Sequence, residues 1–317
     1  MKVISSLLCL LLLVGACGNN NKNVPTIGFL DYVEDATLAQ ARQGFTDALK
    51  TGGYSKEQGT VKILYRNAQG DQPTLIQACD YFISEKVDMI AANTTLATIT
   101  AIQKTKEIPV CMMVAPRPDI AGLTDASGKA PANLFGVYET LSYIDTSVTL
   151  IRYVIPDAKR IGTIYNQAEP QSVDAQKRLA ELCAKLGLEL VSLPVNNSSE
   201  SQLVTQALLG KKVDAFFALP DNVIFASFEV ITKECNDAGV PIFTSEAGLV
   251  KRGAVAAFGA DMYQWGYQSG MQAARFLKEK NLANIKPEQV KVRKRVYNAE
   301  VAKRFSITFD SSFEILR

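Results

Sequence analysis

Polar side chains gather just after the strands that the hydrophobic pattern predicts, where they are placed to bind a charged small molecule. Hydroxyls and amides at helix starts can donate hydrogen bonds to a carboxylate, and acidic side chains can hold an ammonium group. The candidate ligand-binding residues are Thr94, Thr95 and Asn222 for a carboxylate, Asp221, Glu246 and Asp261 for an ammonium group, and Tyr32, Glu34, Asn93, Asn166 and Ser245 beside them.

Each of these candidates also has a simpler explanation. Ser, Thr, Asp and Asn are the residues that most often cap helix N-termini, so capping alone remains an alternative for each of them taken singly. Tyrosines in the same regions would cover an apolar or aromatic ligand body. These tyrosines are Tyr32, Tyr138, Tyr165 and Tyr263.

The chain lacks the residues that many hydrolytic sites require. It contains no histidine, which excludes Ser-His-Asp and Cys-His catalysis and histidine metal sites. No CxxC pair, nucleophile elbow, Walker A loop or EF-hand pattern occurs in it. A carboxylate-dependent enzyme that uses Asp221 and Glu246 stays a remote alternative. We therefore expect a binding protein rather than an enzyme, with neither a cofactor nor a metal.

Four cysteines follow the first 17 residues of the chain, and their pairing is open. In an oxidising compartment they could form disulfides, with three possible connectivities. Three of them fall on the apolar faces of predicted helices and one lies in an apolar strand, which favours buried free thiols. The four residues are Cys79, Cys111, Cys183 and Cys235.

Short apolar runs alternate with amphipathic stretches from Val24 onward. Thr37 and Gln40 form a capping box at the start of the first helical stretch. This alternation predicts a parallel sheet with crossover helices. The strands predicted in the first half are 27–30, 61–65, 89–92 and 110–114.

The same pattern begins again after Pro156, which indicates an internal duplication. The matching segments lie about 130 residues apart and keep their order. The pairs are 26–29 with 160–164, 86–88 with 212–214, and 107–110 with 239–242. A shared βα rhythm without duplication is the alternative.

We therefore predict an α/β protein of two doubly wound parallel-sheet lobes joined by three crossovers, near Tyr138, Gly248 and Lys286. Ligands of such sheets bind beyond the carboxyl ends of the strands, so two facing lobes place the site in the cleft between them. Helix N-termini converge there and favour an anionic group. The expected division is 25–137 plus 256–285 for lobe one, and 138–255 plus 286–317 for lobe two.

The N-terminal residues predict export. Residues 3–14 are almost entirely apolar but too few to span a bilayer, and small residues follow them. Val-Gly-Ala-Cys at 14–17 is similar to a bacterial lipobox, although an ordinary signal peptide is the alternative. We expect a protein anchored by lipid to a membrane and facing the periplasm or cell exterior. The expected parts are a signal peptide over 1–16, a lipid on Cys17 and a flexible tether over 17–24.

Several motifs resemble those of the ABC-transporter substrate-binding proteins described as tryptophan/tyrosine-binding, in the type I periplasmic binding protein superfamily. The resemblance runs from about Pro25 to Phe309. It implies an amino acid ligand, aromatic or other, held between the lobes, and an ABC permease and ATPase as partners. We expect a monomer. The motifs are 33–38 with 41–45, 67–72, 158–162 with 165–166, 197–200, 220–222, 251–254 and 297–299.

Two other roles within this superfamily are alternatives to transport. Repressors with the same lobes carry a DNA-binding helix-turn-helix ahead of them, where this chain has a signal peptide. The net charge is only +2, and both signs are scattered, so we expect no binding to nucleic acid. A lipoprotein that presents its ligand to a membrane sensor kinase, rather than to a permease, stays open as an alternative.

Overall fold

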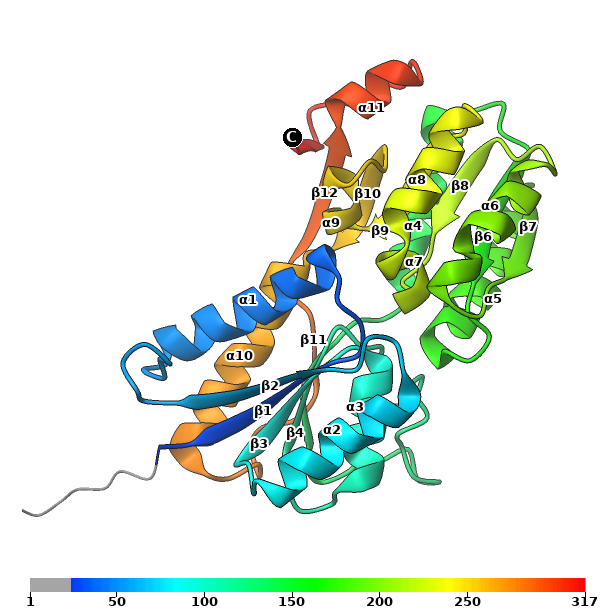
Figure 1. Ribbon diagram of the computed structural model, residues 1–317. Helices are drawn as coiled ribbons and strands as arrows, with labels where there is room; N and C mark the ends of the chain where they lie inside the picture. The colour runs from blue at the N-terminus through cyan, green and yellow to red at the C-terminus, as the bar shows by residue number, and fades with distance from the viewer. Residues whose placement is uncertain (1–23, 317) are drawn as a thin grey trace, which may run out of the picture.

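The computed structural model describes residues 24–316. The predicted signal peptide, the lipidation at Cys17 and nearly all of the tether lie outside the described residues. Within 24–316, no helix has the length and apolar character needed to cross a membrane. Figure 1 shows two lobes, each a sheet with helices on its faces.

Lobe one contains a six-stranded parallel sheet. Apolar side chains on successive residues of its central strands alternate between two hydrophobic clusters, so both faces of the sheet are covered. Helices α1 (Ala36–Thr51) and α10 (Met262–Glu279) cover one face, and α2 (Gln72–Ser84) and α3 (Thr95–Lys104) cover the other. The strand order is β11 (Glu288–Gln289), β5 (Leu134–Tyr138), β4 (Val110–Met113), β3 (Met89–Asn93), β1 (Thr26–Asp31) and β2 (Lys62–Asn67).

Lobe two contains a seven-stranded sheet that is parallel except where β12 runs antiparallel to β10. Its strand order is β13 (Glu314–Leu316), β12 (Arg293–Asn298), β10 (Ala256–Ala260), β9 (Ile242–Glu246), β8 (Ala215–Ala218), β6 (Arg160–Tyr165) and β7 (Glu189–Pro194). Its helices are α4 (Ser142–Val154), α5 (Pro170–Lys185), the 3-10 turn η1 (Ser198–Glu200), α6 (Ser201–Leu209), α7 (Asn222–Ala226), α8 (Phe228–Asp237), α9 (Ala247–Lys251) and α11 (Ala299–Arg304).

The chain passes between the two sheets three times, so the predicted architecture is confirmed, but two of the crossings lie elsewhere than expected. Strand β10 pairs with β9 and β12, so residues 256–260 belong to the sheet of lobe two and the second crossing lies at Asp261 instead of Gly248. Strand β11 pairs with β5 of lobe one, so the third crossing follows Gln289 instead of Lys286. The first crossing lies just after Tyr138.

Glycines let α1 and α10 approach closely along one face of lobe one. A Cβ atom on Gly266 would collide with the carbonyl oxygen of Ala41, and one on Gly44 would collide with that of Tyr263. No other residue type allows this spacing without moving a backbone. The two closely packed helices therefore cover the face of the sheet whose strands lead to the cleft.

The four cysteines within residues 24–316 are free and buried in the structure, as the apolar pattern around them predicted. Burial raises the pKa of each thiol, to about 12 for Cys79 and Cys235, and to about 11 for Cys183. These side chains therefore act as small core hydrophobes.

Candidate ligand-binding site

An inner cavity lies between the lobes, at the carboxyl ends of the central strands of both sheets. Lobe one and the first crossing form one wall of the cavity, with both apolar and polar side chains. Lobe two forms the opposite wall. The lining residues are Thr94, Thr95, Val114, Ala115, Pro116, Glu139, Leu141, Met262 and Trp265 on one side, and Tyr143, Gln171, Pro220, Asn222, Phe225 and Glu246 on the other.

The structure brings four of the predicted site residues together in this inner cavity. Thr94 and Thr95 follow β3, Asn222 follows β8, and Glu246 is the last residue of β9. All four are at most 3% exposed. The rule that ligands lie beyond the carboxyl ends of parallel strands therefore located these side chains, and their roles toward a ligand stay predictions.

Three other predicted residues line a wider outer groove, which adjoins the inner cavity because Asn222 lines both. They are Tyr32, Glu34 and Asn166. Burial, together with the charge of Glu169, raises the pKa of Tyr32 to about 12. Its hydroxyl thus keeps its proton and donates to the carbonyl oxygen of Gly70 at 2.8 Å.

Two predicted acids line neither space, because their carboxylates serve as helix caps. Asp221 is fully buried and accepts hydrogen bonds from the backbone N–H groups of Val223 at 2.7 Å and Ile224 at 3.1 Å. Asp261 accepts from the N–H of Gln264 at 3.0 Å and pairs with Lys294 at 2.7 Å. For both of them the capping alternative is what the structure shows.

The remaining two predicted residues support the site from behind. The amide of Asn93 donates to Asp31 Oδ1 at 2.7 Å, and the hydroxyl of Ser245 lies 3.3 Å from Glu246 Oε1. Neither side chain lines the cavity or the groove. They precede Thr94 and Glu246 in the chain, so they can hold those residues in position.

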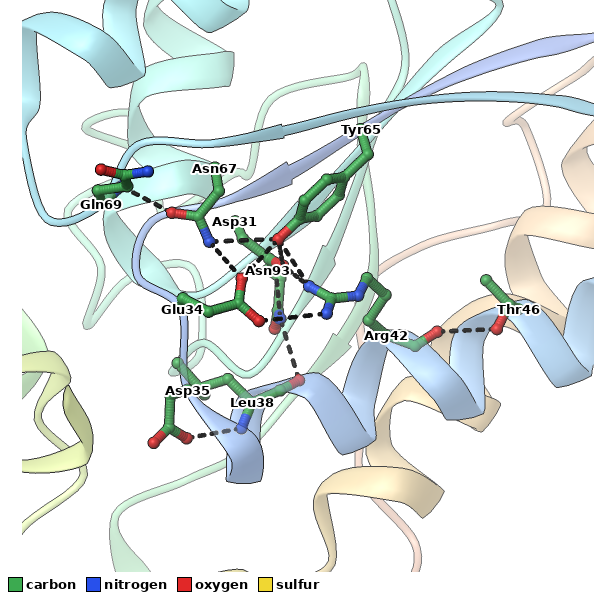
Figure 2. Close-up of polar contacts among 10 residues, drawn as sticks. All are labelled: Asp31, Glu34, Asp35, Leu38, Arg42, Thr46, Tyr65, Asn67, Gln69 and Asn93. Carbon is green, nitrogen blue, oxygen red and sulfur yellow. Dashed lines mark hydrogen bonds and ion pairs between the residues drawn. The ribbon is translucent and has the colours of Figure 1, made fainter. Parts of the chain in front are cut away.

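A polar network at the rim of lobe one surrounds Asp31 (Figure 2). The guanidinium of Arg42 pairs with Asp31, lies 3.5 Å from a Glu34 oxygen and stacks over the ring of Tyr65. The Tyr65 hydroxyl donates to Asp31 Oδ2 at 2.9 Å. Burial raises the pKa of Asp31, and the charge of Arg42 opposes that shift. Arg42 therefore holds the Glu34 side chain against lobe one.

Three buried polar atoms that line the inner cavity have no hydrogen-bond partner in the structure. They are Thr94 Oγ1, Gln171 Oε1 and Glu246 Oε2. Buried polar atoms of native proteins are nearly always paired, so each unpaired one calls for an explanation. The three residues line one cavity and come from both lobes, and a polar ligand in that cavity would supply the partners that these atoms lack.

Helix α3 points an uncapped N-terminus at the cavity. Its N-cap residue Thr94 has φ of +89° and makes no side-chain cap bond. A β-branched residue at such an angle costs on the order of 1–3 kcal/mol, and strain of this kind clusters at functional sites. The unfilled N–H groups and the positive end of the helix favour a carboxylate.

Acidic side chains occupy the end of the cavity that lies near the first crossing. Burial raises the pKa of Glu246 well above its usual range, the charge of Glu139 raises it further, and hydrogen bonding with Ser245 and Tyr143 opposes the shift. Glu139 is itself paired with Arg293 at 2.6 Å. Among residues 24–316, Glu246 has no cationic partner of its own, so it is suited to bind an ammonium group.

Several lining residues were missed by the sequence reasoning. Glu139 directly follows β5, so the rule that selected Glu246 would have selected it too. Gln171 stands in the first turn of α5, one residue after Pro170, which is a recognisable helix start. Phe225 and Trp265 reach the cavity from helices, and the indole N–H of Trp265 donates to the Val137 carbonyl at 2.8 Å. Nothing in their spacing distinguishes them from core residues.

Comparison with known proteins identifies the family to which this chain belongs. Residues 26–315 match the family model described as ABC transporter substrate binding protein. The chain is 35% identical over 266 residues to the tyrosine-binding protein of Clostridioides difficile (strain R20291), an alignment that covers 84% of this chain and 76% of that protein.

Solved structures show the same fold. A conserved domain protein of Vibrio cholerae has a TM-score of 0.83 at 29% identity, covering 91% of this chain and 96% of the other. The ABC domain of Streptococcus pneumoniae in complex with L-Trp has a TM-score of 0.83 at 26% identity, with the same coverage. A ligand-free, open substrate-binding protein of Clostridium difficile has a TM-score of 0.67 at 27% identity, covering 93% and 99%. The chain belongs to the family of ABC transporter substrate-binding proteins, which bind solutes and are not enzymes.

Proposed function

We propose that this protein is the lipid-anchored, extracytoplasmic binding protein of an ABC importer, and that it holds an amino acid with an aromatic side chain between its lobes. The observation that carries the proposal is the inner cavity, which is lined both by the uncapped N-terminus of α3 and by the buried Glu246, whose Oε2 atom has no hydrogen-bond partner. A zwitterion supplies the two charges that these groups lack. The curated relative named for tyrosine and the neighbour solved with L-Trp support the aromatic class.

The proposed pose follows from the chemistry of the walls. The ligand carboxylate accepts hydrogen bonds at the start of α3, from Thr94 and Thr95, and the ammonium group pairs with Glu246. The apolar body packs between Phe225 of lobe two and Trp265 of lobe one. Aromatic walls of this kind favour a flat, apolar ligand body.

Binding is proposed to draw the lobes together. A ligand that touches both walls favours the closed arrangement by its differential affinity for the two states. In support, this structure is more similar to the L-Trp complex, with a TM-score of 0.83, than to the ligand-free open protein, with a TM-score of 0.67, at nearly equal identity. The ligand would then pass to the permease, with the ATPase driving import.

Export and anchoring rest on the N-terminal sequence. The motif at 14–17 ends in the cysteine that would carry the lipid. In cells, the wild-type protein is expected to take up radiolabelled palmitate and to remain with the membrane fraction. The Cys17→Ala variant should take up no label, and labelling of that variant would contradict the proposed anchor.

Calorimetric titration with defined ligands tests the proposed pose. L-Trp and L-Tyr are expected to bind, whereas tryptamine, which lacks the carboxylate, and indole-3-propionate, which lacks the ammonium group, should each bind at least about 100-fold more weakly. Absence of binding by every aromatic amino acid would overturn the proposal.

A matched pair of variants tests the assigned partner of the ammonium group. Glu246→Gln keeps the size of the side chain and removes its charge, so it should weaken amino acid binding strongly. Glu234→Gln serves as the control, since Glu234 accepts from Gln202 and Gln206 within lobe two and lines neither the cavity nor the groove. Equal affinities in the two variants would remove Glu246 from the site.

A further inference from the structure

Gln171 places an unused hydrogen-bond acceptor in the inner cavity. It stands in the first turn of α5 in lobe two, is 7% exposed, and its Oε1 atom has no partner. The proposed pose does not use this oxygen, because the ligand carboxylate and ammonium are already matched to other groups. A buried acceptor that lines a binding cavity is suited to meet a donor on the ligand.

The orientation of the Gln171 amide is determined by its neighbours. Its nitrogen donates to Glu169 Oε2. That oxygen also accepts from the backbone N–H of Asn222 at 3.1 Å and from the Asn222 amide at 3.0 Å. An oxygen that receives these donors acts as an acceptor toward Gln171 as well. The amide nitrogen therefore faces Glu169, and the amide oxygen is directed away from Glu169, in a residue that lines the cavity.

The strand order of lobe two sets the separation between Gln171 and the acidic end of the cavity. Glu246 ends β9 and Gln171 follows β6, with β8 between these two strands. Neighbouring strands lie about 4.8 Å apart, so the carboxyl ends of β9 and β6 are separated by roughly 10 Å, and Gln171 lies six residues beyond the end of β6. An aromatic amino acid lying lengthwise would extend across this part of the cavity, with its ammonium group at one end and the edge of its ring at the other.

The charges at the two ends fix the direction of the ligand. Glu139 and Glu246 supply carboxyl groups at one end, whereas the group that faces the cavity at the other end is the uncharged amide of Gln171. A cation is held better by the acidic end. The ring therefore points toward Gln171, and a polar hydrogen on its far edge can reach Oε1.

We infer that Gln171 determines specificity by accepting a hydrogen bond from the ring O–H of tyrosine or the ring N–H of tryptophan, and so disfavours phenylalanine. The inference rests on the proposed function, since it names which aromatic amino acids the same cavity prefers. Phenylalanine fills the space but leaves the buried oxygen unpaired. It should therefore bind roughly 10- to 100-fold more weakly than tyrosine.

Titration calorimetry with L-Tyr and L-Phe tests the inference, first on the wild-type protein and then on two variants. Gln171→Met keeps the length of the side chain and removes the acceptor, so the Tyr/Phe affinity ratio should fall to near one while L-Phe binds as well as before or better. Gln176→Met is the matched control, because Gln176 lies on the same helix, donates to Ser192 at 3.1 Å and lines neither the cavity nor the groove. Its ratio should equal that of the wild type.

The outcomes separate this inference from the proposed function. Wild-type protein that binds L-Phe as tightly as L-Tyr overturns the role of Gln171 and leaves the aromatic ligand class intact, whatever the variants do. A Gln171→Met variant whose affinities for L-Tyr and L-Phe fall by the same factor also overturns it. The amide would then contact the amino acid backbone that both ligands share, or would only maintain the structure of the cavity wall. Failure of all aromatic amino acids to bind overturns the proposed function, and this inference with it.

Discussion

The carboxyl of Glu246 should make ligand binding depend on pH. Its pKa is raised by burial and by the charge of Glu139, so the ligand-free protein holds a proton there at pH values where an ordinary glutamate is ionised. An ammonium group beside it favours the ionised form and lowers that pKa. Binding therefore releases a proton, and affinity rises as the pH rises toward the raised pKa of the ligand-free protein.

Proton release is measured by titrating the ligand in buffers of different ionisation enthalpy at one pH. The apparent binding enthalpy should vary with the buffer for the wild type and should not vary for Glu246→Gln. The same raised pKa predicts that the ligand-free protein loses free energy of unfolding as pH rises from the usual carboxyl range through the pKa of the folded protein, since the folded state holds the proton longer than the unfolded chain. A binding enthalpy that is independent of buffer would contradict the assignment of the ammonium group to Glu246.

At the scale of single residues, the sequence predicted which side chains lie at the ends of strands better than it predicted what those side chains bind. Thr94, Asn222 and Glu246 were found because the ends of buried strands are visible as the ends of apolar runs. Asp221 and Asp261 occupy equivalent positions, yet their oxygens bond to backbone N–H groups of their own helices. Capping and ligand binding use the same atoms, so residue type and spacing cannot distinguish them.

Helix α3 has no side-chain cap, whereas α1, α2 and α10 of the same lobe have one, and this difference has a testable consequence. In Thr94→Gly, the positive φ of +89° no longer carries a steric cost, while the hydroxyl that faces the cavity is lost. The free energy of unfolding should change by less than about 1 kcal/mol, whereas the affinity for the ligand should fall. Urea denaturation and calorimetry measure the two quantities, and a variant that is strongly destabilised would show that Thr94 serves the fold instead.

At the scale of elements, the prediction failed where local signals compete. The capping box of Thr37 and Gln40 was wrong, because Asp35 caps α1 and accepts from the N–H groups of Thr37 and Leu38. Either residue is a suitable cap, and the position of the turn before the helix decides between them. Strands with unbroken apolar runs, such as β1 and β3, were predicted correctly because nearly all of their residues are buried.

For the whole molecule, the repeated pattern was enough to predict two lobes and a cavity between them, but not the sites where the chain crosses. Residues 256–260 are apolar enough for either sheet, and only pairing with β9 and β12 assigns them to lobe two. The pairing of β11 with β5 involves two residues, Glu288 and Gln289. Such contacts between distant segments leave no local pattern in the sequence.

Arg252 forms a contact between the lobes that should stabilise the closed arrangement. Its guanidinium, at the end of α9 in lobe two, donates to Asp35 at 2.5 Å and to the Thr37 hydroxyl at 3.1 Å, both at the start of α1 in lobe one. The side chains of Arg252 and Asp35 are 14% and 1% exposed. Opening the cleft would break this contact, and removing one partner of a shielded ion pair leaves the other charge buried and uncompensated.

The Arg252→Ala variant is therefore expected to shift the lobes toward the open state and to release the ligand faster, with affinity reduced by about tenfold or more. Arg160→Ala is the control, because Arg160 pairs with Glu189 inside lobe two at 2.8 Å. Small-angle scattering should show compaction on ligand addition for the wild type and the control, and a larger radius of gyration for ligand-free Arg252→Ala. In the closed state the variant would lack the contact between the lobes and would also leave the Asp35 carboxylate buried without its partner. An unchanged dissociation rate would show that the lobes close without this contact.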